Sequence, residues 1–165
     1  MKKVLLVIPE QSYKSNDFVL AAKRLKIPFF IITDSEQVSE KLSDNIIVSD
    51  FSKDITQIVL DKLIDITHVL PVDHSSLVYA AKLVDLLNAK GNSIYSVNLA
   101  MDKYKSREIF NEITEVKIKN KYVNNMDDVD EFVTKYKFGV LKPTKGTASN
   151  RAVSYTHLTL PTNRE

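Results

Sequence analysis

The sequence predicts an α/β fold, a doubly wound parallel sheet followed by an incomplete α+β unit. Across residues 1–97, short apolar runs rich in branched side chains alternate with amphipathic helical patterns. The spacing of these runs suits right-handed crossovers through helices, which join parallel strands. After residue 97 the alternation stops, and Val116–Lys119 alternates apolar and polar residues as a half-exposed antiparallel strand does.

The predicted strands of residues 1–97 are short and apolar throughout. This pattern is typical of strands that are buried on both faces of a parallel sheet. The first of them is closed by Pro9, and the second ends at Asp34. The four runs are Val4–Ile8, Phe29–Thr33, Ile46–Val48 and His68–Val72.

Helical patterns lie between these runs. Ser15, Asn16 and Asp17 offer caps for a first helix, and we expect its apolar face to contain Phe18, Ala21, Ala22 and Leu25. A weaker helical pattern covers Glu36–Leu42, and a further amphipathic helix contains Ile55, Ile58, Val59 and Leu63. The last helix, Leu77–Asn88, follows the capping sequence Asp73-His74-Ser75-Ser76 and stops near Gly91.

Residues 98–152 predict the start of a second domain. Asn98 can cap a helix that runs to Glu112, and the alternating strand Val116–Lys119 follows it. A helix opened by Asp127 and Asp128 comes next, with Val129, Phe132, Val133 and Tyr136 on one stripe. An apolar strand, Phe138–Pro143, closes the region.

Residues 153–165 differ in composition from everything before them. Written back into codons, residues 153–162 resemble a translated transposase mosaic-end adapter of the kind used in sequencing libraries. We therefore leave residues 153–165 out of the predicted fold and expect the natural protein to be longer. The alternative is a natural strand followed by a polar tail.

Composition excludes several classes of function. The 23 basic and 21 acidic residues give a net charge of +2, so no global basic field points to nucleic acid or to an anionic membrane. The absence of cysteine excludes disulfides and thiolate metal sites. No secretory signal and no apolar span of membrane length is present, so a cytoplasmic protein is expected.

The first domain offers weak candidate sites. The turn after Val4–Ile8 contains no glycine, which argues against a dinucleotide site there, and no Walker A loop is present. Asp34 and Asp73 follow strands at the edge where open α/β sheets bind ligands, although a turn or cap role is the commoner one. Asp73, Ser75 and Ser76 form the better candidate for substrate contact, because free N–H groups at a helix start can meet an anion. No metal-spaced partner accompanies His68 or His74.

The stretch from Lys142 to Ser149 is the most informative part of the chain. It places a lysine at the end of an apolar strand and then a short loop of Thr, Gly, Ala and Ser. A fixed cation and flexible backbone N–H groups are what a polyphosphate needs.

The order of these segments resembles the amino-terminal portion of an ATP-grasp ligase. An α/β domain precedes an Asp-Lys helix (Asp102-Lys103), a strand and a helix, and then an apolar strand enters Lys-Pro-x-x-Gly (Lys142 to Gly146). The stretch Tyr13–Asp34 is also similar to the first domain of amino-acid ligases in that superfamily. The resemblance covers nearly all of residues 1–152 and divides them into a pre-ATP-grasp domain, 1–97, and the start of the ATP-grasp domain, 98–152.

The resemblance implies a role for particular residues. Lys103 would reach a nucleotide phosphate, and Lys142 would contact the α- and β-phosphates. The loop residues Gly146, Thr147, Ala148 and Ser149 would close over the β- and γ-phosphates. The cofactors would be ATP and Mg²⁺, and the substrates a small-molecule carboxylate and an amine joined through an acyl-phosphate.

The sequence also departs from the family pattern. Asn150 or Arg151 stands where the loop usually has a glycine, and Ile113 to Val116 replaces the usual Gly-x-Pro-x-Pro entry. The adenine-binding hinge and the magnesium ligands belong to a part of the family fold beyond these residues, so this chain alone is expected not to turn over. Alternatives are a stand-alone α/β small-molecule-binding or receiver-type module without catalysis, and a glycosyl- or nucleotidyl-transferase half.

Overall fold

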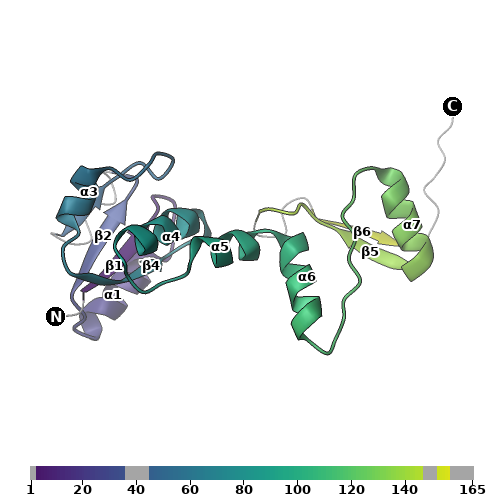
Figure 1. Ribbon diagram of the computed structural model, residues 1–165, viewed down its shortest axis with the longest axis horizontal. Helices are drawn as coiled ribbons and strands as arrows, with labels where there is room; N and C mark the ends of the chain where they lie inside the picture. Colours follow the sequence, from purple (N-terminus) through teal and green to yellow (C-terminus); the bar gives the residue numbers. More distant parts are fainter. Residues whose placement is uncertain (1–2, 36–44, 147–151, 157–165) are drawn as a thin grey trace. The chain divides into compact units, whose positions relative to one another are not determined.

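Residues 3–35, 45–146 and 152–156 are described by the computed structural model of the 165-residue chain (Figure 1). The chain divides into two units, Met1–Asn98 and Leu99–Glu165.

The first unit is built on a parallel sheet of four strands in the order β3-β2-β1-β4. β1 (Lys3–Ile8) lies in the centre, and Leu6 is opposite Ile31 of β2 (Phe29–Thr33) and Leu70 of β4 (Ile66–Pro71). The edge strand is β3 (Ile46–Val48). These strands confirm the predicted α/β class, and β4 starts two residues earlier than predicted.

Helices cover both faces of this sheet, as predicted for a doubly wound fold. Leu5 and Val7 of β1 join the apolar cluster on one face, and Leu6 and Ile8 join the cluster on the other. All four side chains are 2% exposed or less, which explains why this strand is apolar throughout and does not alternate. The helices are α1 (Ser15–Arg24), α3 (Gln57–Lys62), the short 3₁₀ helix η1 (His74–Ser76) and α4 (Leu77–Leu86).

The predicted apolar face of α1 is partly wrong. Val19 and Ala22 are its buried residues, whereas Ala21 is exposed and Leu25 is 68% exposed. Ala21 and Leu25 are four residues apart and lie on the same side of the helix, which faces away from the buried stripe of Val19 and Ala22. The helix predicted at residues 36–42 lies outside the described residues.

Two positions beside α4 are tightly packed in the first unit. Tyr79 is 2% exposed, stacks on Phe51 with ring centroids 4.4 Å apart, and shares a 2.6 Å hydrogen bond with the Ser49 hydroxyl. Burial raises the pKa of the Tyr79 phenol. A Cβ at Gly91 would lie 2.5 Å from Val84 Cγ2, so this position has no room for a side chain.

The second unit begins with a helix break that the sequence analysis missed. We predicted one helix over residues 98–112, but α5 (Ile94–Met101) and α6 (Lys103–Ile113) are separate helices. Asp102 between them is extended, with φ −102° and ψ 106°, and acts as the N-cap of α6. Asn98 lies inside α5 and caps nothing.

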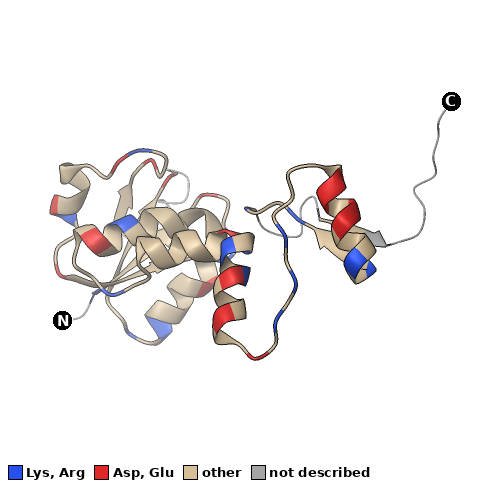
Figure 2. Cartoon of the chain, turned by 45° about the vertical axis from the view of Figure 1, so that its right-hand side comes forward, with Lys and Arg blue, Asp and Glu red and all other residues tan. Residues whose placement is uncertain are grey.

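The second unit also contains a helix and a two-stranded sheet. α7 (Met126–Tyr136) follows the N-cap Asn125, carries acidic residues in its first turn and a lysine in its last turn, and so complements the helix dipole (Figure 2). It packs against β5 (Phe138–Leu141), where a Cβ at Gly139 would be 3.2 Å from the Phe132 ring. Phe138 and Val140 of β5 remain 69% and 55% exposed.

Residues left out of the predicted fold contribute the second strand of this sheet. β6 (Val153–Thr156) pairs antiparallel with β5, with Val153 opposite Leu141. Leaving the whole of residues 153–165 out was therefore wrong for the fold. Strand pairing uses backbone groups, and the β-branched and aromatic residues of Val-Ser-Tyr-Thr suit it whatever the origin of their codons.

The strand predicted at Val116–Lys119 is absent, and residues 117–123 form irregular backbone. The Asn111 side chain replaces a partner strand there: its Nδ2 donates to the Ile118 carbonyl at 2.8 Å, and its Oδ1 accepts from the Ile118 N–H at 2.9 Å. The predicted half-exposed pattern is also wrong, because Val116 and Ile118 are 75% and 48% exposed and no apolar face is buried.

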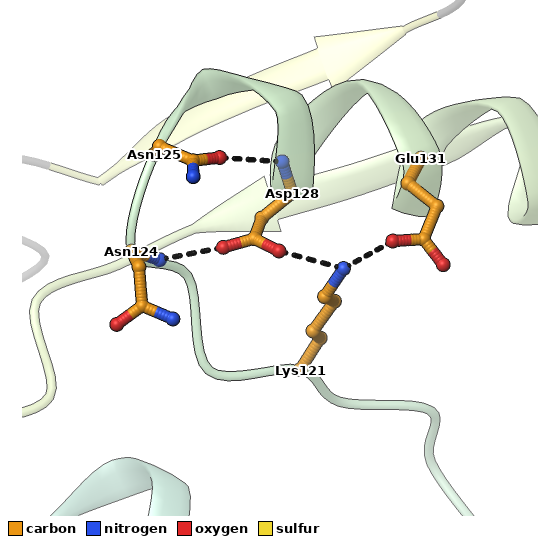
Figure 3. Close-up of polar contacts among 5 residues, drawn as sticks. All are labelled: Lys121, Asn124, Asn125, Asp128 and Glu131. Atoms are coloured by element: carbon orange, nitrogen blue, oxygen red, sulfur yellow. Dashed lines mark hydrogen bonds and ion pairs between the residues drawn. The ribbon is translucent and has the colours of Figure 1, made fainter.

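Lys121 attaches this irregular segment to α7 (Figure 3). Its ammonium lies 2.8 Å from Asp128 Oδ1 and 2.5 Å from Glu131 Oε2, and the Asn124 N–H donates to the other Asp128 oxygen. The hydrogen bond from Lys121, followed by that from Asn124, lowers the pKa of Asp128 to about 2. The cluster is structural, and it fixes the chain between α6 and α7.

Candidate functional site

The strongest candidate site is at the start of α6. Asp102 Oδ1 accepts hydrogen bonds from the N–H groups of Tyr104 at 3.0 Å and Lys105 at 3.1 Å, and the Asp102 carbonyl accepts from the Ser106 N–H. The acidic residue of the Asp-Lys pair therefore caps the helix. The Oδ1 atom of its carboxylate is thereby engaged by the helix.

Lys103 connects this helix to the loop after β5. The Lys103 N–H donates to the Thr144 carbonyl at 2.8 Å, and the Lys103 ammonium donates to the Gly146 carbonyl at 2.7 Å. Two segments 43 residues apart in sequence are thus held side by side. The structure brings together two of the segments that the sequence analysis selected, the Asp-Lys helix and the Lys-Pro-x-x-Gly loop.

Two further lysines belong to the same loop. Lys142 and Lys145 are exposed, and within the described residues neither ammonium has a hydrogen-bond or ion-pair partner. The Cα of Lys142 is within about 7 Å of that of Thr144, because only two peptide units separate them. Lys142 and Lys145 thus add two uncompensated positive charges beside Lys103, which is a suitable field for a polyphosphate.

Gly146 adopts a backbone conformation that favours glycine. Its φ is +115°, a region that residues with a Cβ rarely adopt, and no atom of the described residues lies within 4 Å of the place where a Cβ would stand. A glycine here is needed for conformation and also leaves the backbone accessible. Thr147, Ala148 and Ser149, which we predicted to continue the phosphate loop, lie outside the described residues.

The weaker candidate in the first unit is a capping box at η1. Asp73 Oδ1 accepts from the His74 N–H at 2.6 Å, and the fully buried Ser76 hydroxyl donates to the Asp73 carbonyl. Ser76 therefore serves the fold. Asp73 is half-buried and Ser75 is exposed, and substrate contact by these two remains a prediction.

Polar groups that the sequence analysis did not select lie near this cap. Ser12 after β1 donates to Asp73 Oδ2 at 3.3 Å, and Ser35 after β2 donates to Glu10 Oε1 at 3.1 Å. Asp34, considered from the sequence, accepts from the Glu10 N–H at 2.7 Å and so holds a turn. These groups follow the strands on both sides of the switch between β1 and β4, where open sheets bind ligands, and the sequence signal was the polar turn after each strand.

Neither a metal-binding cluster nor a membrane-spanning helix occurs among the described residues. The described ranges contain no group of three or more His, Cys, Asp and Glu side chains that could hold a metal ion. In the same ranges, every helix falls short of the length and apolar character that a membrane span requires.

Comparison with known proteins gives matches by structure only. No protein-family model matches the chain, and no curated protein sequence matches it. Three solved structures illustrate what it is similar to. An L-amino acid ligase from Bacillus licheniformis has a TM-score of 0.62 at 15% identity, and N5-carboxyaminoimidazole ribonucleotide synthetase from Thermotoga maritima has 0.66 at 17%. Phosphoribosylglycinamide synthetase from Anaerococcus prevotii has 0.59 at 19%.

The matches cover most of this chain but less than half of each similar protein. They cover 94%, 96% and 87% of this chain but only 39%, 42% and 37% of the respective ligase and synthetases. At this identity the likeness shows the fold alone. In fold, the chain is similar to this ligase and these two synthetases, and it spans about two fifths of their length.

Proposed function

We propose that this chain is the amino-terminal part of an ATP-dependent carboxylate–amine ligase of the ATP-grasp superfamily. The observation that carries the proposal is the pair of hydrogen bonds from Lys103 to the loop after β5, because they join the two segments that would bind the triphosphate. Other solved structures of similar fold support nucleotide use: one contains ATP and another contains ADP with 5-aminoimidazole ribonucleotide.

In this proposal the lysines bind and orient the nucleotide. Lys103 and Lys142 contact the phosphates, and Gly146 with Thr147, Ala148 and Ser149 covers the β- and γ-phosphates. The carboxylate oxygen attacks the γ-phosphorus and releases ADP, and the amine then attacks the acyl carbon and releases phosphate. Positive charge held in place before the reaction offsets the charge of the nucleotide, which is the largest contribution such a site makes.

The substrates and the metal belong to the whole enzyme in this proposal. The first unit, with Asp73 and Ser75 at the end of β4, would contact the small-molecule carboxylate or amine. Magnesium would arrive with ATP. Its ligands would come from outside the described residues, which offer no acidic cluster, and we assign no step to it here.

The packing of the second unit supports a longer parent protein. Among its described residues the buried apolar side chains are Val129 and Val133, while Phe138, Val140 and Ile113 are more than half exposed. A domain of this size normally buries a larger core. We propose that further chain, corresponding to the remaining three fifths of the similar ligases, completes this unit.

Calorimetric titration with ATP, ADP and AMP tests the proposal. We expect affinity to fall in that order, because each lost phosphate removes charge from the lysine site. The genomic sequence beyond codon 152 provides a second test, since it should continue into the acidic magnesium ligands of a ligase. No nucleotide binding, together with a stop codon there, would favour the stand-alone binding module.

A further inference from the structure

The Lys103 ammonium binds a backbone carbonyl at the place where the proposed function requires a phosphate. We propose that Lys103 exchanges partners: it holds the Gly146 carbonyl in the nucleotide-free protein and releases it when a polyphosphate binds. This inference rests on the proposed function. It adds a competition between the loop backbone and the ligand for one ammonium group.

The geometry allows this exchange without unfolding the loop. Two separate bonds tie the loop to α6, one from the Lys103 N–H to Thr144 and one from the Lys103 ammonium to Gly146. The first uses the helix backbone and does not depend on the side chain. When the ammonium leaves, the loop therefore stays attached at Thr144, and only its Gly146 end is released.

Gly146 has little else to hold it. It is exposed and has no side chain, and among the described residues no atom lies within 4 Å of its would-be Cβ position. In the same part of the chain, the hydrogen bond from Lys103 is the one that Gly146 makes. Among the described residues, this bond is therefore the contact that a ligand would have to replace.

A phosphate oxygen is the stronger partner for the same ammonium. The carbonyl offers a dipole, whereas the phosphate offers a full negative charge, and bonds between two charged groups are about twice as strong. The α6 N–H groups nearest to Lys103 are engaged by Asp102 and Thr144, so they do not supply an alternative anion site. A polyphosphate that binds the Lys103 ammonium would therefore draw it away from Gly146.

One NMR signal can report this bond directly. The chain has three glycines, and Gly146 is the one that precedes a threonine. Labelling glycine carbonyls with ¹³C and threonine amides with ¹⁵N in the full chain gives a single carbonyl–amide cross-peak, from Gly146 and Thr147. Its ¹³C frequency follows hydrogen bonding at the Gly146 carbonyl.

Without nucleotide, we expect Lys103→Met to move this ¹³C frequency upfield. Lys105→Met is the matched control: it removes an exposed charge two residues away whose ammonium has no partner in the described residues, and it should leave the frequency unchanged. The amide spectrum of each variant verifies folding. A Lys103→Met peak at the wild-type position would overturn the inference, whatever the nucleotide does.

Titration with ATP, and with inorganic tripolyphosphate as a probe without a base, tests the exchange. In the wild type we expect the ¹³C frequency to move upfield, with a midpoint that matches the dissociation constant measured by calorimetry. If ATP binds and the carbonyl frequency remains that of the bonded state, the exchange is wrong and the proposed function stands. If calorimetry detects no ATP binding, the proposed function fails and the exchange fails with it.

Discussion

Gly91→Ala tests how tightly the first unit is packed. The new Cβ would lie 2.5 Å from Val84 Cγ2 and 3.0 Å from the Val69 carbonyl oxygen. The backbone cannot easily move away, because the neighbouring Lys90 donates to Thr67 and accepts from the Val69 N–H, both at 2.9 Å. Overpacking of this kind destabilises a core by about 1–3 kcal/mol.

A second substitution identifies the contact that causes the loss. Val84→Ala removes two methyl groups, at a cost of about 1.5 kcal/mol. It also removes the atom closest to the new Cβ, so Gly91→Ala in this background should cost less than about 1 kcal/mol. The loss of stability in the double variant should therefore be about 1 kcal/mol smaller than the sum of the losses in the two single variants.

Native-state hydrogen exchange of the β1 amides measures this effect. The central strand exchanges through unfolding of its unit, so its exchange free energy reports the stability of the first unit without interference from the second. Gly139→Ala, whose Cβ would meet the Phe132 ring at 3.2 Å in the second unit, is the control and should leave the β1 amides unchanged. Strict additivity of Gly91→Ala and Val84→Ala would refute the packing argument.

Three further predictions concern single polar groups. The pKa of Asp128 is lowered from 3.8 to about 2, so its contribution to stability is complete above pH 4 and is lost as the pH falls towards 2; Asp128→Asn should remove this dependence from the exchange of the α7 amides, and an unchanged pH profile would contradict it. Tyr79→Phe keeps the stacking on Phe51 but leaves the Ser49 hydroxyl without its partner. It should lower the free energy of unfolding by about 1 kcal/mol in a denaturant titration, and an unchanged free energy would count against this hydrogen bond. Asp102→Ala removes two cap bonds and should lower α6 stability by about 1 kcal/mol, whereas Asp102→Asn should restore most of it; equal exchange of the α6 amides in both variants would be the opposing result.

The strands of the first unit could be predicted from sequence because burial on both faces leaves a clear signal. Residues such as Leu5 and Ile31 are fully buried, and their runs contain few polar residues. The face of α1 was harder to predict, because apolar residues also stand on its exposed side, where Ala21 and Leu25 are four residues apart. Local pattern identifies the helix better than it identifies which apolar stripe of the helix is buried.

The second unit was less predictable because its pattern admits more than one structure. Asn98 and Asp102 are both good caps, and tertiary contact decides between them: the Lys103 N–H, freed by the break at Asp102, binds Thr144. Likewise the alternation at Val116–Lys119 fits an exposed strand, but Asn111 takes the hydrogen bonds that a partner strand would use.

The resemblance implied that the Asp-Lys helix and the loop after Lys142 meet at one nucleotide, but it did not imply a direct contact between them. A lysine at a strand end and an Asp-Lys helix start are each visible in the sequence, yet the contact between Lys103 and Gly146 spans 43 residues and could not be inferred from either segment. The sequence analysis placed the helix cap at Asn98, and the structure shows that Asp102 caps α6.

The central claim is that Lys103 and Lys142 bind one triphosphate, and a pair of double variants tests it most directly. Lys103→Met with Lys142→Met should weaken ATP binding by at least about tenfold in calorimetry, because each lost charged contact to phosphate costs about 1.5–3 kcal/mol. Lys105→Met with Lys119→Met makes the same change in net charge and should weaken binding by no more than about twofold at the same ionic strength. Equal losses in the two double variants, or no loss in the first, would contradict the account.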